Sequence, residues 1–408
     1  IRHWKQLTGN EKFIAGECQS TGQQIYKTFV DLDQIKFYCT CQQEKKPCKH
    51  ALALLLIYLD SSHLLTIVDQ APDWFSSLEE KARKKDEISK QQLEKKAIQQ
   101  ARTRDARFEL MEAGVKELET WLFDFIRQGL AVSETQSEAF WEDFAARMVD
   151  AKLGAIGKKI RLLKNISRTN NWHERLLQEL GDLYLFVRAF QKLEQLPEIL
   201  QQELLNFAGV TVKKDELIQQ NGQKDEWLVI GQITGVEENL NFRRSWLLGA
   251  KTGRLALILD FLWGRGNFPM DWKPGQVIEA ELVFYPAAYP LRAIIKNYQW
   301  SKKPFDGLCG FKFLEDFTKA YAQALAKNPW LSSFPVLLEK VIPLFEKDQL
   351  YLVDHLRKRI RIETNPGETW KILAISGGHP IALFGEWDGS SFRPLSIITG
   401  GRIIPLHS

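Results

Sequence analysis

Hydrophobic and polar positions alternate with different periods along the chain, and these changes divide it into segments. Near the start, β-branched and aromatic residues fill positions 25–30 and 35–38, with the polar stretch 31–34 between them. This pattern predicts a β-hairpin. An Ala- and Leu-rich run at 51–59 follows, and its composition favours a helix. Residues 1–75 are therefore predicted to hold a small ββα unit.

The pattern becomes helical further along. Val115, Leu118, Leu122 and Phe125 recur at helical spacing, and Gly129 is a plausible stop for that helix. The stretch Ser133-Glu134-Thr135-Gln136 fits a capping box that opens the next helix. Apolar stripes from 172 to 207 repeat the theme, with Pro197 dividing them. We expect an α-helical domain over 108–208, preceded by a charged helical linker over 76–107.

After residue 209 the period changes to that of strands. The predicted strands lie at 210–212, 226–233, 245–249, 254–259 and 276–284. The sequence Lys251-Thr252-Gly253 suits a hairpin turn between two of them. These observations predict an antiparallel β domain over 209–304.

The remaining residues, 305–408, predict a mixed helical and β part. Helices are expected over 311–346, including the apolar segment 337–344. Strands are expected at 369–375, 381–387 and 392–398, and Asp388-Gly389 marks a hairpin between the last two.

Composition places the chain among ordinary globular proteins. Of its 408 residues 44% are hydrophobic and 26% are charged, which suits two or three domains. The longest apolar run has nine residues, too few to cross a membrane, and the first residues carry no signal-peptide pattern. We therefore expect a cytoplasmic protein with no membrane partner. The net charge of +4 is small for a protein that binds nucleic acid through phosphates.

One cluster of residues carries clear chemistry. Cys39 and Cys41 are two positions apart, and Cys48 and His50 follow after a short loop. Three thiolates and one imidazole at this spacing predict a tetrahedral Zn²⁺ site. Alternate residues of a strand point to the same side, so the first pair can face one metal. The second pair stands at the predicted start of the helix, where the helix dipole favours a thiolate.

The alternatives to zinc are unrelated thiols or a disulfide, and a reducing compartment disfavours the latter. With four protein ligands the site has no open position for a catalytic water. We therefore interpret the zinc as a folding element. The chain also lacks the glycine-rich phosphate loop, the dinucleotide-binding motif and the nucleophile elbow. We expect a protein that is not an enzyme.

Basic residues gather in two further stretches. Residues 81–107 hold ten basic and four acidic side chains, and a second group follows Gly157. For both stretches a solvated helix face is the favoured interpretation. The alternative is a cationic surface that contacts phosphate. The residues that would then bind nucleic acid are Lys45, Lys46, Lys49, Lys84, Lys85, Lys158, Lys159 and Arg161.

The motif Cys-x-Cys…Cys-x-His within a β-β-α unit resembles the SWIM zinc finger, here over about residues 14–60. The segments Gly16-Glu17-Cys18-Gln19 and 47–54 are similar to those of larger bacterial SWIM proteins. The resemblance implies a zinc-dependent interaction module without known enzymatic activity, for which protein and DNA partners have both been proposed. It also implies companionship with an AAA+ ATPase or a von Willebrand A protein.

Together these observations predict an α+β multidomain protein: a small ββα zinc finger, an α-helical domain, an antiparallel β domain and a mixed helical and β C-terminal part. The favoured function is that of a zinc-binding, non-catalytic adaptor or scaffold that contacts another protein. The alternative is a DNA-binding protein that uses the finger and the basic segments.

Overall fold

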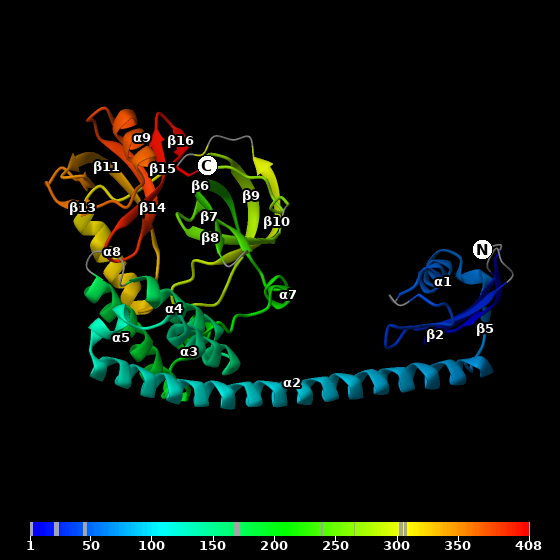
Figure 1. The fold of residues 1–408 in the computed structure, drawn as a ribbon. Helices are drawn as coiled ribbons and strands as arrows, with labels where there is room; N and C mark the ends of the chain where they lie inside the picture. Colours follow the sequence, from blue (N-terminus) through cyan, green and yellow to red (C-terminus); the bar gives the residue numbers. More distant parts are fainter. Residues whose placement is uncertain are drawn as a thin grey trace. The chain divides into compact units, whose positions relative to one another are not determined.

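The computed structural model describes residues 3–19, 24–43, 47–166, 172–237, 240–264, 266–301, 305 and 308–407. The chain divides into two compact units, Ile1–Ala106 and Arg107–Ser408. The long helix α2 (Asp73–Gln128) begins in the first unit and ends in the second (Figure 1). The predicted linker over 76–107 and the helix after it are thus one continuous helix, because no proline or glycine interrupts the segment before Gly114.

The first unit is built on a five-stranded sheet with the order β4-β3-β2-β1-β5. Its strands are β1 (Trp4–Gly9), β2 (Phe13–Gln19), β3 (Ile25–Asp31), β4 (Lys36–Cys39) and β5 (Thr66–Ile67). Neighbours are antiparallel, except that β5 runs parallel to β1. The predicted hairpin is β3–β4. The sequence pattern did not indicate β1, β2 and β5, because short strands with mixed polarity give little periodic signal.

Both faces of this sheet are covered. Helix α1 (Lys49–Asp60) packs Ala51 and Leu54 against Ile14 and Val30 on one face, and the short 3₁₀ helix Ser62–Leu64 follows it. On the other face the start of α2 contributes Phe75, whose ring stacks on Phe29 with centroids 3.6 Å apart. Burial on two sides gives this small unit a hydrophobic core of its own.

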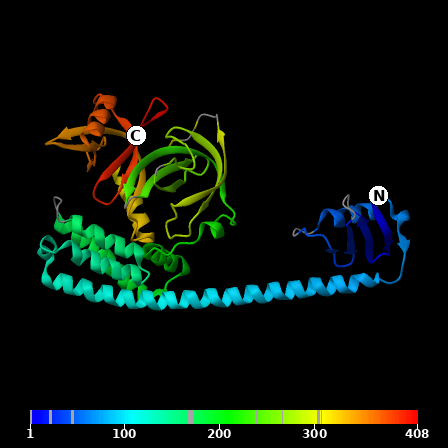
Figure 2. The ribbon, with the colours of Figure 1, turned by 45° about the vertical axis from the view of Figure 1, so that its right-hand side comes forward.

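The second unit begins with a helical bundle. The end of α2 packs with α3 (Glu138–Asp150), α4 (Gly154–Ile166), α5 (Trp172–Phe190) and α6 (Glu198–Ala208) (Figures 1 and 2). Buried Trp141, Phe144 and Phe186 lie in its core. As predicted, α2 ends before Gly129, which adopts a positive φ of 87°, and Pro197 stands immediately before α6.

The predicted capping box at 133–136 was wrong. Residues 130–134 form a 3₁₀ helix, Leu130–Glu134, so Ser133 cannot adopt the extended conformation of an N-cap. The N-cap of α3 is Ser137, whose hydroxyl accepts a hydrogen bond from the backbone N–H of Phe140. A further short 3₁₀ helix, Leu193–Gln195, connects α5 to α6.

Next comes a five-stranded antiparallel sheet with the order β10-β9-β6-β7-β8. Its strands are β6 (Gln223–Glu237), β7 (Leu240–Gly249), β8 (Leu255–Trp263), β9 (Val277–Phe284) and β10 (Ala293–Ser301), preceded by α7 (Lys214–Leu217). The long strand β6 pairs with β9 through its first half and with β7 through its second half. A parallel bridge between Leu257 and Arg292 joins β8 to the start of β10. The sheet therefore curls into a partly closed barrel.

Local chemistry explains the barrel's turns. The predicted turn at 251–253 is present, and the Asp225 carboxylate fixes it by accepting hydrogen bonds from the backbone N–H groups of Lys251 and Thr252.

The strand predicted at 210–212 was wrong. Those residues pair with no strand but connect α6 to α7, and Val212 packs beside Leu217 instead.

The C-terminal part forms a six-stranded sheet with the order β13-β12-β11-β14-β15-β16, flanked by two helices. Its elements are α8 (Leu314–Lys327), β11 (Phe334–Glu346), β12 (Gln349–Val353), β13 (Arg359–Arg361), α9 (Pro366–Ser376), β14 (Ile381–Trp387), β15 (Phe392–Thr399) and β16 (Arg402–Pro405). This sheet packs on the outside of the barrel through Phe384 and Leu395. Gly231 makes the close approach possible, because a Cβ there would lie 2.7 Å from the Phe384 ring.

Two predictions in this part were wrong. The segment 337–344, expected to be helical, lies in strand β11, and Pro343 within the segment disfavours a helix because it has no backbone N–H to donate. The segment 369–375, expected to be a strand, lies in helix α9. Asn365 and Glu368 cap that helix reciprocally, and Pro366 stands in its first turn.

Among the described residues, no helix combines the length and the apolar character that crossing a membrane requires.

Candidate metal centre

The structure brings the four predicted ligands together in the first unit. Cys39 ends strand β4, Cys41 lies two residues beyond it, and Cys48 and His50 stand at the start of α1. Their ligand atoms all lie within 4.8 Å of one another. Cys39 and Cys41 were predicted to share one strand, but β4 ends at Cys39. The sulfur atoms of both residues nevertheless lie in the same cluster.

The hairpin supplies more than the first ligand. Thr28 on β3 pairs with Cys39 across the strands, and its hydroxyl lies 3.3 Å from the Cys39 sulfur. Tyr26, two residues earlier on the same side of β3, stacks its ring on His50 with centroids 4.6 Å apart. Sequence reasoning did not single out these two residues. Both residues lie on the strand predicted to pair with the Cys39 strand, two positions apart, and this spacing could have indicated that their side chains point toward the ligands.

Cys48 caps the helix with its sulfur. The thiol is buried and accepts a hydrogen bond from the backbone N–H of Ala51 at 3.5 Å. Burial works to raise the pKa of Cys48, but hydrogen bonds from Ala51 and from the Cys41 and Cys39 side chains outweigh it and lower the pKa. The helix start thus favours a thiolate at Cys48, as the sequence predicted.

His50 turns its Nδ1 atom toward the cluster. Nδ1 lies 3.7 Å from the Cys39 sulfur, and ligands at tetrahedral zinc bond lengths would be about 3.6 Å apart. Burial, followed by the charge of Lys49, lowers the pKa of His50. The imidazole is therefore neutral at pH 7, the form that binds a metal.

The Cys39 thiol depends on a cation for its ionisation. Burial raises the pKa of Cys39 to about 12, in spite of hydrogen bonds from Thr28 and from the Cys41 backbone. A bound metal deprotonates such a thiol outright. Three sulfurs and one imidazole nitrogen at these separations fit Zn²⁺. They would hold it with protein ligands at all four positions.

The described residues among those predicted to bind nucleic acid lie on helices α1, α2 and α4. Lys45 and Lys46 lie outside the described residues. Lys49 is exposed at the start of α1. Lys84 forms an ion pair with Glu80 at 2.6 Å within helix α2. Lys85 also lies in α2, but its side chain is outside the described part of the chain.

The second basic stretch meets carboxylates. Lys158 pairs with Glu237 at 2.7 Å, and Lys159 pairs with Glu179 at 3.4 Å. The Arg161 guanidinium donates hydrogen bonds to both carboxylate oxygens of Glu142. These acidic partners offset much of the positive charge on α4. The ion pairs therefore favour the interpretation of this face as a solvated helix surface over that of a phosphate-binding surface.

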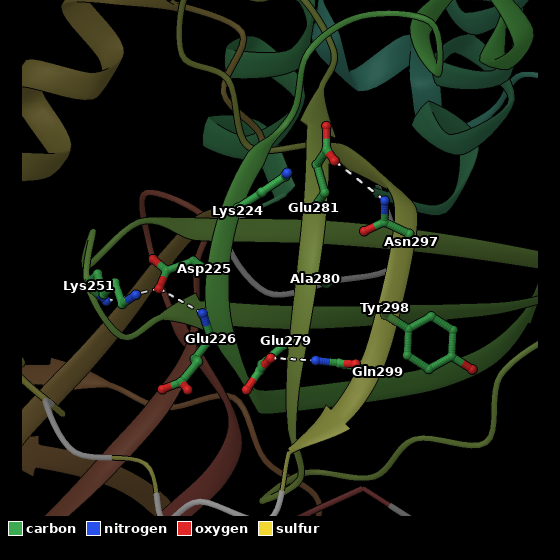
Figure 3. Close-up of a pocket in the computed structure, with 10 residues that line it drawn as sticks. All are labelled: Lys224, Asp225, Glu226, Lys251, Glu279, Ala280, Glu281, Asn297, Tyr298 and Gln299. Atoms are coloured by element: carbon green, nitrogen blue, oxygen red, sulfur yellow. Dashed lines mark hydrogen bonds between the residues drawn. The ribbon is translucent and has the colours of Figure 1, made fainter.

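A polar pocket of about 570 Å³ lies on the barrel, across β6, β9 and β10 (Figure 3). Its acidic groups serve the fold. Glu281 accepts a hydrogen bond from the backbone N–H of Gly222 and pairs with Lys296, and Glu279 accepts one from Gln299. Because these contacts already engage the carboxylates, we assign no chemistry to this pocket.

A Cys₃His cluster on a β-hairpin and a helix start, followed by a helical bundle, defines a zinc-finger protein. Comparison with protein-family models matches residues 26–59 to the SWIM zinc finger and residues 106–208 to a SWIM-associated four-helix bundle domain. The chain therefore contains a SWIM zinc finger followed by a SWIM-associated helical bundle. No curated protein and no solved structure matched the chain.

Proposed function

We propose that this protein is a non-catalytic adaptor that binds another protein through the outer face of helix α1. The observation that carries the proposal is a row of leucines, Leu52, Leu56 and Leu59, which we name the leucine ridge. Their exposed fractions are 45%, 64% and 72%. They recur at helical spacing on the side of α1 opposite Ala51 and Leu54, which face the sheet.

Helix α1 is thus apolar on two faces, although the first unit covers only one of them. A helix that is hydrophobic on all sides is usually buried. Contiguous exposed leucines are a recognised mark of a protein–protein interface. A phosphate backbone would gain nothing from such a surface, because it is recognised by cationic groups.

Bound zinc would hold the leucine ridge in position, because it fixes the start of the helix that carries the ridge. Cys48 is the N-cap of α1, and His50 lies in its first turn. Two of the four proposed ligands therefore fix the end of the helix that carries the ridge. This coupling explains why an interaction module would need the metal without using it for catalysis.

Two further features support the proposal. A coordination sphere filled by four protein side chains leaves no place for an activated water. Thiols also stay available as metal ligands in a reducing compartment such as the cytoplasm, where disulfides are rare. An AAA+ ATPase or a von Willebrand A protein is the partner class that the family resemblance suggests.

The test compares a ridge variant with a matched control. The double variant Leu56→Glu/Leu59→Glu places two charges on the ridge, and Leu177→Glu places one on α5, where the leucine is 55% exposed. Proteins captured from native extract by the zinc-loaded chain are quantified by mass spectrometry, then purified and titrated back. We expect a direct partner whose affinity falls at least tenfold in the ridge variant and is unchanged in the control.

DNA binding is the competing outcome. A gel-shift titration with single- and double-stranded DNA at two salt concentrations measures it on the same proteins. Salt-sensitive binding that is lost in Lys45→Glu/Lys46→Glu or in Lys49→Glu, together with a ridge variant that keeps every captured partner, would overturn the adaptor proposal.

A further inference from the structure

A second pocket lies in the second unit, where the bundle, the barrel and the C-terminal part meet. Its volume is about 260 Å³. Arg244 and Trp246 of β7 line one side, and Tyr285 and Arg292 come from the ends of the β9–β10 connection. Trp330 and Ser333, between α8 and β11, complete it. Pockets at the meeting of domains are a frequent place for small ligands.

The pocket's polar groups are suited to an anion with a planar ring. The Arg292 guanidinium lies 4.4 Å from the centroid of the Tyr285 ring, and no carboxylate among the described residues pairs with it. Arg244 is held in place by Glu386 at 2.8 Å. The Ser333 hydroxyl is shielded from solvent and has no hydrogen-bond partner within the described chain.

The walls are fixed by a buried carboxylate. Glu203 of α6 accepts a hydrogen bond from the backbone N–H of Ala288 and one from the Asn328 side chain, each 2.9 Å long. These contacts tie the bundle to the β9–β10 connection and to the segment after α8. Glu203 also lines the pocket, and burial raises the pKa of its carboxyl group.

The connectivity of the barrel gives an independent pointer. Its first strand, β6, pairs with the second and fourth, and its third and fifth meet in parallel at Leu257 and Arg292. This is the arrangement of OB-type Greek-key barrels, which hold oligonucleotides against strands 2 and 3 and the loop between strands 4 and 5. The corresponding elements here are β7, β8 and residues 285–292, which line the pocket. A fold alone does not determine a ligand, but the arginines and aromatic rings of this pocket offer groups that could bind a nucleotide.

We propose that this pocket binds one nucleotide unit, with the base against the aromatic side chains and the phosphate on Arg292. At about 260 Å³ the pocket is smaller than most small-ligand sites, so it has room for no more than one such unit. The unit could come from a free mononucleotide or from a single strand of nucleic acid. This inference is independent of the adaptor function, which rests on the leucine ridge in the other unit.

The experiment uses the zinc-loaded full chain and two probes. AMP is titrated calorimetrically, and a fluorescein-labelled oligothymidylate of about 12 nucleotides is titrated by anisotropy. Arg292→Gln removes the cation, and Thr211→Trp obstructs the exposed rim of the pocket without touching the core. Arg254→Gln is the control, because Arg254 also stacks on an aromatic ring of the barrel, Phe284, but lies outside the pocket.

We expect at least one probe to bind, with affinity reduced tenfold or more in both pocket variants and unchanged in the control. Binding of AMP alone identifies the ligand as a free nucleotide. Binding of the oligonucleotide alone identifies it as a single strand of nucleic acid. The proposal is overturned if neither probe binds. It is also overturned if binding survives both pocket variants, or if inorganic phosphate competes as well as AMP does.

Discussion

At the scale of single residues, the metal centre combines four ligands with two side chains that contact them, Thr28 and Tyr26. Cys39, Cys41, Cys48 and His50 need only a hairpin end and a helix start to meet. Thr28 and Tyr26 could not be predicted with the same ease. Their contacts with Cys39 and His50 depend on the register between β3 and β4, which a sequence pattern specifies less sharply.

Thr28→Val should weaken zinc binding about tenfold, because it removes a hydrogen bond to a ligand sulfur while keeping the shape of the side chain. Competition with a chelator measures the affinity. Thr66→Val, at an exposed position of β5 in the same unit, is the matched control. Equal affinities for both variants would show that the Thr28 hydroxyl plays no part in the site.

Cys48→Ser should release the metal and loosen the first unit while leaving the second one intact, because the two have separate cores. Amide hydrogen exchange should show lost protection over α1 and β3–β4, with unchanged protection in the bundle. Full zinc content in this variant would contradict the assigned ligand set.

At the scale of elements, long periodic patterns predicted the type of each helix or strand correctly, whereas short apolar runs did not. The bundle helices and the strand pair β14–β15 were indicated by long or bounded patterns. The segments 337–344 and 369–375 were assigned to the wrong type, because a brief apolar run suits a buried strand and a helix equally. The informative residues are Pro343 within β11 and the Asn365 cap that precedes α9.

The turn of the β3–β4 hairpin holds a strained residue. Ile35 has a φ of 51°, in the left-handed region that β-branched residues avoid, and its side chain is exposed. Ile35→Gly should therefore stabilise the zinc-loaded first unit by about 1 kcal/mol. Thermal unfolding measures the change. Ile25→Gly, in the extended strand β3, should instead destabilise the unit, and the same direction for both would argue against strain at Ile35.

At the scale of the whole molecule, the second unit is held together by contacts between segments that lie far apart in the sequence. The barrel and the C-terminal sheet form one apolar interface, with Trp246 and Leu248 on one side and Phe384 and Leu395 on the other. Such an interface could not be derived from sequence, because each strand alone reads as an ordinary buried strand. The same holds for the pocket beside it, whose residues come from three parts of the chain.

Gly231→Ala should destabilise the second unit by about 1–3 kcal/mol, because the added methyl group would press on the Phe384 ring. Denaturant unfolding of the full chain, followed by tryptophan fluorescence, reports the loss. Gly181→Ala is the control: no atom surrounds a Cβ at that position of α5, and the helix should gain stability. An unaffected Gly231→Ala protein would mean that the two sheets are not packed closely there.

The most direct test is the metal content and coordination of the purified 408-residue chain. Elemental analysis, combined with X-ray absorption at the zinc edge, should give one zinc per chain bound by three sulfurs and one imidazole nitrogen. A chain that is folded without metal, or a zinc whose sphere includes a water oxygen, would contradict the closed, non-catalytic centre from which the adaptor role is inferred.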